Sequence, residues 1–114
     1  MLQIFHNNRC GKSRNCLEML EASGKEFEIV SYLTTPPTED ELRVVLQKLN
    51  LAPMELIRQK EKIWIEQFKG QDLTNEALLK IMVANPILIE RPILVSEKKA
   101  IIARDETKIM EFLK

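Results

Sequence analysis

Residues 1–20 read MLQIFHNNRCGKSRNCLEML and indicate how the chain begins to fold. The apolar run MLQIF favours a short strand at the start of the chain. Apolar residues at helical spacing follow from Cys16, and Gly24 is placed to end that helix. The loop between the strand and the helix carries Cys10 among basic residues. The chain therefore opens as strand, cysteine loop and helix.

The pattern continues as strand, helix and a helical insertion. Residues 27–30 favour a second strand, which the turn-forming TTPP at 34–37 ends. Thr38 and Glu41 form a capping-box pattern ahead of an apolar helical stripe. Residues 52–85 are helical and more charged, with one short helix entered through a proline. We expect the helical insertion to cover about 38–85 of a single domain that spans residues 1–114.

The C-terminal part favours a hairpin and a last helix. The run ILI at 87–89 is strand-like, and ILVS at 93–96 and AIIA at 100–103 are joined by a short polar link, which is typical of an antiparallel pair. Asp105 can cap the final helix. The order β-α-β, insertion, β-β-α predicts an α/β protein with a mixed sheet and a thioredoxin-like fold.

Composition limits the possible functions. The chain has 114 residues, 45% of them apolar and 30% charged, and Lys plus Arg and Asp plus Glu both total 17. With these equal totals, the chain has no overall positive charge that would attract nucleic acid or an anionic membrane. No apolar run approaches the roughly 20 residues of a membrane span, and no signal peptide is apparent. We expect a cytoplasmic monomer whose thiols stay reduced.

Cys10 is a candidate nucleophile. A residue at the start of the first helix faces unpaired amide hydrogens and the positive end of the helix dipole, which favour a thiolate and can also hold an oxyanion. Arg14 and the other nearby cations act in the same direction. His6 either adds a polar partner or makes an ordinary hydrogen bond at the strand end. The alternative for Cys10 is a packed thiol in a basic loop.

Cys16 is predicted to be a core residue rather than a resolving thiol. Ser13 occupies the position where a CxxC motif would have its second cysteine. If residues 11–16 are helical, about 9 Å along the helix axis separate Cys10 from Cys16. A disulfide needs Cα atoms closer than about 7 Å.

Three arginines are candidate oxyanion ligands. Arg58, Arg91 and Arg104 lie next to apolar runs, where a charge needs either a partner or a site. A guanidinium group offers the planar donor fork that tetrahedral oxyanions accept. The alternative for each is a surface salt bridge to a nearby acidic residue. No His, Cys or Asp cluster has the spacing of metal ligands, so we expect no metal.

These motifs together resemble the glutaredoxin-dependent arsenate reductase family. The resemblance rests on HN-x-x-CGKSR near the N-terminus, YLTTPPT at 32–38, ELIRQK at 55–60, NPILIERPILV at 85–95 and Arg104. It runs in order over nearly the whole chain. It implies a thioredoxin-like fold with a helical insertion and a cis proline, which Pro92 matches.

The resemblance also implies a mechanism. Cys10 would be the nucleophile that attacks arsenate, and Arg58, Arg91 and Arg104 would neutralise the oxyanion. His6, Ser13, Arg14 and Pro92 would support the site. Glutathione would serve as co-substrate and glutaredoxin as protein partner, and no cofactor would be bound.

Besides arsenate reduction, two other functions remain possible: a transcriptional regulator and a reductase of another substrate. Redox-responsive regulators that bind the RNA polymerase alpha subunit share the fold, but many sense oxidation through a CxxC, which Ser13 interrupts here. Retention of all three arginines favours oxyanion chemistry. The third possibility is a glutathione-dependent thiol reductase that acts on another substrate.

Overall fold

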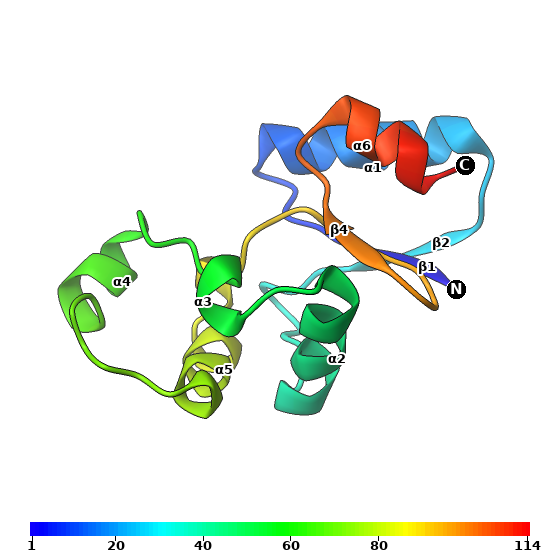
Figure 1. The fold of residues 1–114 in the computed structure, drawn as a ribbon. Helices are drawn as coiled ribbons and strands as arrows, with labels where there is room; N and C mark the ends of the chain where they lie inside the picture. The colour runs from blue at the N-terminus through cyan, green and yellow to red at the C-terminus, as the bar shows by residue number, and fades with distance from the viewer. The chain divides into compact units, whose positions relative to one another are not determined.

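The computed structural model describes residues 1–114, which form two compact units (Figure 1). The first consists of Met1–Thr35 and Arg91–Lys114, and the second of Pro36–Glu90. The first unit contains β1 (Leu2–Phe5), α1 (Gly11–Ser23), β2 (Phe27–Val30), β3 (Ile93–Val95), β4 (Ala100–Ile102) and α6 (Glu106–Phe112). The second contains α2 (Glu39–Leu49), α3 (Pro53–Leu56), α4 (Lys62–Gln67), α5 (Asn75–Ala84) and a 3-10 turn (Pro86–Leu88). The predicted order of strands and helices is confirmed, whereas the single-domain boundary stays a prediction.

The first unit is built on a four-stranded mixed sheet in the order β2-β1-β3-β4. β1 pairs with β2 in parallel and with β3 in antiparallel, and β3 pairs with β4 in antiparallel. Phe5 lies opposite Ile93, which in turn lies opposite Ile102. The end of β1, the start of β3 and the end of β4 therefore meet at one end of the sheet.

Helices α1 and α6 lie side by side against this sheet (Figure 1). Their buried side chains and those of the strands form one apolar cluster: Ile4, Cys16, Leu20, Leu94, Ala103, Ile109 and Phe112. Gly24 ends α1 with a φ of 74°, a left-handed conformation that glycine adopts without a steric cost. Asp105 caps α6 by accepting hydrogen bonds from the Thr107 and Lys108 amides, as the sequence predicts.

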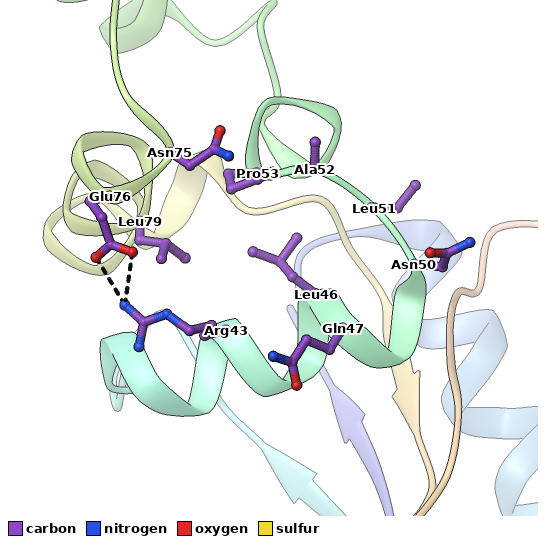
Figure 2. A pocket seen from close by; sticks show the side chains of 10 residues that line it. All are labelled: Arg43, Leu46, Gln47, Asn50, Leu51, Ala52, Pro53, Asn75, Glu76 and Leu79. Atoms are coloured by element: carbon purple, nitrogen blue, oxygen red, sulfur yellow. Dashed lines mark hydrogen bonds and ion pairs between the residues drawn. The ribbon is translucent and has the colours of Figure 1, made fainter.

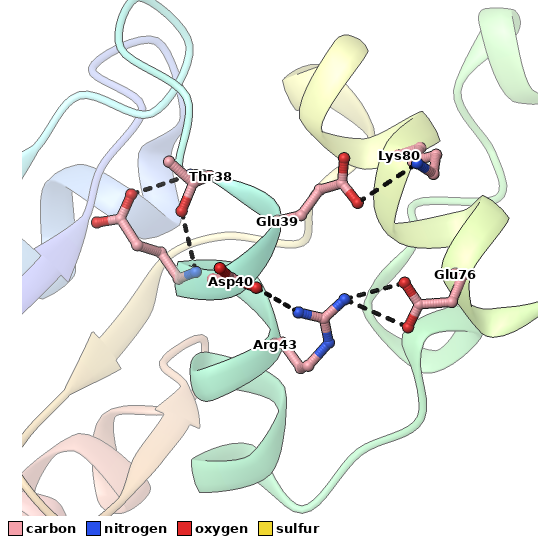
Figure 3. A network of polar contacts seen from close by, with 7 residues as sticks. Thr38, Glu39, Asp40, Arg43, Glu76 and Lys80 are labelled. Atoms are coloured by element: carbon pink, nitrogen blue, oxygen red, sulfur yellow. Dashed lines mark hydrogen bonds and ion pairs between the residues drawn. The ribbon is translucent and has the colours of Figure 1, made fainter.

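In the second unit, a polar network joins α2 to α5 (Figure 3). The predicted capping box is present, because Thr38 N–H donates to Glu41 Oε1 at 2.9 Å and Glu41 N–H donates to Thr38 Oγ1 at 3.1 Å. Arg43 contacts Asp40 at 2.6 Å and Glu76 on α5 at 2.9 Å. The ion pair between Arg43 and Glu76 links the two helices at the surface.

One predicted strand is wrong. Residues 87–89 were expected to be extended, but a 3-10 turn covers Pro86–Leu88. The Leu88 amide donates to the Asn85 carbonyl at 2.9 Å, so the proline-led turn continues past the end of α5. Only Ile89 reaches a β-bridge, with Ile57. Short apolar runs do not distinguish a buried strand from a buried turn.

None of the helices combines the length and the apolar character that a membrane crossing requires.

Candidate functional site

Cys10 lies at the N-terminus of α1, as the sequence predicts. It is the N-cap residue of the helix and is half-buried. Its amide donates to the Asn7 carbonyl at 3.0 Å, and its own carbonyl accepts from the Arg14 amide at 3.0 Å. The first helical turn has no acidic residue. The thiol therefore lies beside helix amides that no carboxylate competes for.

A buried hydrogen-bond cluster supports the Cys10 loop. Ser13 is fully buried, and its Oγ accepts from the Asn7 amide at 3.0 Å and contacts His6 Nδ1 at 2.6 Å. The Asn7 side chain stabilises a turn in the loop, because its Oδ1 accepts a hydrogen bond from the Arg9 amide at 3.0 Å. Through these contacts, the Ser13 side chain connects α1 to the residues that follow β1.

Burial favours the neutral form of His6 in this cluster. Burial lowers the pKa of His6 from its ordinary value, and the contact with Ser13 offsets this only in part. Because the Asn7 amide already donates to Ser13 Oγ, the Ser13 hydroxyl can donate its proton to Nδ1 of a neutral ring. The sequence left open whether His6 supports the site or makes an ordinary hydrogen bond, and the structure shows the hydrogen bond to Ser13.

Arg91 and Arg104 lie at the same end of the sheet as the Cys10 loop. The Arg91–Pro92 peptide bond is cis, in agreement with the resemblance, and Pro92 leads directly into β3. Arg104 is exposed, and its Nη1 donates to the Arg91 carbonyl at 2.9 Å. Asp105 forms no ion pair with Arg104, since its carboxylate caps α6. The two arginines are thus held together by a direct contact.

Arg91 carries an unusual feature. Its Nε and Nη1 are buried, and neither has a hydrogen-bond partner in the structure. A buried charge without partners is costly, so such donors are expected to meet an anion. The sequence pointed to this arginine through its position ahead of a strand, but it could not show that two of its guanidinium nitrogens are buried without partners.

Arg58 belongs to the second unit and is paired. Its Nη1 lies 3.1 Å from Glu61 Oε2, and its Nε lies 3.2 Å from Glu90 Oε1. The side chain is 23% exposed. The ion pair to Glu90 is one of the alternatives that the sequence allowed.

Cys16 is a core residue, as predicted. It is fully buried in the apolar cluster between α1, α6 and the sheet. Burial raises the pKa of its thiol to about 12. Cys10 and Cys16 are both free thiols. Only Cys10 has access to solvent.

Sequence reasoning missed Asn7 and two pockets. Asn7 is a buried polar residue, and its sequence signals are its position near the end of a strand and its place in the HN-x-x-CGKSR motif. One pocket, of about 680 Å³, adjoins the Cys10 loop and is lined by residues 6–9 and by the segment that follows β2. The other, of about 560 Å³, lies between α2 and α5 around Arg43, and none of the predicted site residues lines it (Figure 2). No group of three or more His, Cys, Asp or Glu side chains is placed to hold a metal ion.

The chain is similar to known proteins over most of its length. The ArsC family profile matches residues 5–112. An Escherichia coli protein named "Uncharacterized protein YfgD" is 42% identical over 98% of this chain and 96% of its own length. An arsenate reductase of Neisseria meningitidis is 41% identical over 90% of both chains. The solved structure of an arsenate reductase from Vibrio cholerae is 36% identical, with a TM-score of 0.91 over 96% of this chain and 95% of that one. The predicted thioredoxin-like fold is confirmed, and the chain belongs to the ArsC family.

Proposed function

We propose that the protein reduces arsenate to arsenite through nucleophilic attack by Cys10, with glutathione and glutaredoxin as electron donors. Membership of the ArsC family and the similarity to named arsenate reductases support this proposal. So does the position of Cys10 at the N-terminus of α1, on the sheet end that also carries two arginines.

The first step joins sulfur to arsenic. The Cys10 thiolate forms an S–As bond, and an As–O bond breaks as that oxygen leaves with two protons as water. Arsenic stays pentavalent in this adduct. The amides at the start of α1 and the guanidinium groups stabilise the negative charge on the remaining oxygens.

The second step transfers the electrons. The sulfur of glutathione attacks the Cys10 sulfur, an S–S bond forms, and the S–As bond breaks with its electron pair left on arsenic. Arsenite, which is trivalent, leaves. The glutaredoxin thiolate then attacks the glutathione sulfur of the mixed disulfide and returns Cys10 as a thiolate. The reaction needs neither a metal nor a bound cofactor.

The two buried nitrogens of Arg91 that lack a hydrogen-bond partner, Nε and Nη1, are the observation that carries the proposal. These nitrogens require an acceptor, and an oxyanion bound at Cys10 would provide one. Arg104 would hold the Arg91 backbone and complete the anion site. We include Arg58 as the third member of the set; it would have to exchange an ion pair with Glu61 or Glu90 for the substrate.

The test is arsenate-dependent NADPH oxidation coupled through glutathione, glutathione reductase and glutaredoxin. We expect turnover by the unmodified protein and none by Cys10→Ser. Arg91→Lys keeps the charge but loses the donor fork, so the rate should fall on the order of 10²-fold while the fold survives. Arg43→Lys, at an arginine held in ion pairs between α2 and α5, is the matched control and should keep full activity.

Two results would contradict the proposal. Equal rates for Arg91→Lys and Arg43→Lys would remove Arg91 from the anion site. Thiol turnover that does not depend on arsenate would instead favour a glutathione-dependent reductase of another substrate. Binding of the RNA polymerase alpha subunit without arsenate turnover would favour a regulator.

A further inference from the structure

We propose that the pocket between α2 and α5 binds a short extended segment of a partner protein, in which an apolar residue stands next to a lysine or an arginine. The ten residues that line this pocket all belong to the Pro36–Glu90 unit. None of them takes part in the proposed reaction, so the inference goes beyond the proposed function and does not depend on it.

The pocket has an apolar floor. Leu46 on α2 and Leu79 on α5 point toward each other across it, and Pro53 at the start of α3 borders them (Figure 2). The volume of about 560 Å³ lies within the usual range for ligand sites. An apolar side chain seated on this floor would leave water, and the burial of apolar surface is the main driving force of most protein association.

The rim indicates the backbone conformation of the occupant. Gln47, Asn50 and Asn75 line the pocket and are exposed, and none of their side chains forms a hydrogen bond in the structure. A carboxamide both donates and accepts, so it complements a peptide group. An extended segment keeps backbone N–H and C=O groups free for such contacts, whereas a helix satisfies its own. The rim therefore favours an extended segment.

The length of the pocket suits such a segment. Arg43 and Asn50 lie seven residues apart on one face of α2, which corresponds to about 10 Å along the helix axis. Three residues of an extended chain cover about the same distance. The segment that contacts the pocket is therefore short.

One end of the pocket carries an excess of negative charge (Figure 3). Arg43 is shared between Asp40 at 2.6 Å and Glu76 at 2.9 Å. Beside this network, Lys80 lies 3.9 Å from Glu39, so three carboxylates face two cations. The side chains of Asp40 and Glu76 are 92% and 63% exposed. A lysine or arginine of the segment complements this end, whereas an acidic residue would be repelled.

A random heptapeptide library displayed on phage can identify the segment on the intact protein. We expect the enriched sequences to share an apolar residue next to Lys or Arg. A synthetic peptide of an enriched sequence, titrated into ¹⁵N-labelled protein, should shift the amide signals of residues 47, 50, 51 and 75. Replacing its basic residue with glutamate should abolish these shifts, and added salt should weaken binding of the original peptide.

Gln47→Lys and Gln67→Lys make the same change inside and outside the pocket. Gln67 is exposed at the end of α4 and does not line the pocket. Gln47→Lys places a like charge at the rim, so the dissociation constant of the peptide should rise about tenfold or more. Gln67→Lys should bind as the unmodified protein does. Circular dichroism checks that both variants keep the fold.

Four results would overturn the inference. They are the absence of any enriched sequence, enriched sequences without a basic residue, shifts confined to another surface, and equal affinities of the two variants. Concentration-dependent shifts of the same amides without peptide would assign the pocket to a second copy of this chain, which would also overturn it.

Discussion

Replacing Ser13 with alanine tests whether the Cys10 loop depends on one buried hydroxyl. Ser13 is fully buried, and its Oγ accepts from the Asn7 amide at 3.0 Å and contacts His6 Nδ1 at 2.6 Å. Asn7 itself is only 8% exposed, so its amide has no ready access to water once the hydroxyl is gone. Ser13→Ala therefore leaves a buried donor unsatisfied.

The expected cost follows from that single donor. An orphaned buried amide lowers the free energy of unfolding by about 1–3 kcal/mol. The His6 ring is partly exposed and can bond to water, so it adds little. For a chain of this size, the loss corresponds to a fall in Tm of roughly 4–12 °C. The same change should also loosen the loop that holds Cys10.

Urea denaturation and calorimetry measure this loss, with Ser23→Ala as the matched control on the same helix. Ser23 Oγ donates to the Leu20 carbonyl at 2.6 Å near the exposed end of α1, where water can replace it. The control should change the free energy of unfolding by less than about 0.5 kcal/mol. Equal losses in the two variants would contradict this prediction, because they would show that the buried hydroxyl contributes no more than an exposed one.

Three further predictions concern single side chains. Iodoacetamide should label Cys10 and leave Cys16 unmodified until the protein unfolds, since burial raises the pKa of Cys16 to about 12; mass spectrometry that finds Cys16 labelled first would contradict this. Burial lowers the pKa of His6 in the folded protein, so the unfolded state binds more protons and the free energy of unfolding should fall as the pH drops below about 6.5. His6→Gln should show a flatter pH dependence in urea titrations, and an identical slope would exclude His6 as the cause. Asp105→Ala removes the α6 cap and should cost about 0.5–2 kcal/mol in the same titrations, whereas Asp105→Asn, which can still cap, should cost clearly less.

The order of elements could be predicted from the sequence because it depends on local signals. The glycine at 24 and the caps at Thr38 and Asp105 end or begin helices through contacts within a few residues, and all three are found as expected. The prediction of a strand at 87–89 is wrong because a three-residue apolar stretch is too short to show a period that would distinguish a strand from a turn. Cys10 could be placed at a helix start for the same local reason.

The state of each charged and polar group was decided by tertiary structure. Arg58 and Arg91 look alike in sequence, yet Arg58 forms two ion pairs while Arg91 has buried nitrogens without partners. His6 and Ser13 are seven residues apart and meet only because the first helix folds back over the strand end. The order of strands and helices and the candidate nucleophile can therefore be predicted without the structure, because helix caps, turns and periodicity act over a few residues. Which charges are satisfied and which hydroxyl is buried follows only from the folded structure, because burial depends on how strands and helices pack, and some partners, such as Glu90 for Arg58, lie far along the chain.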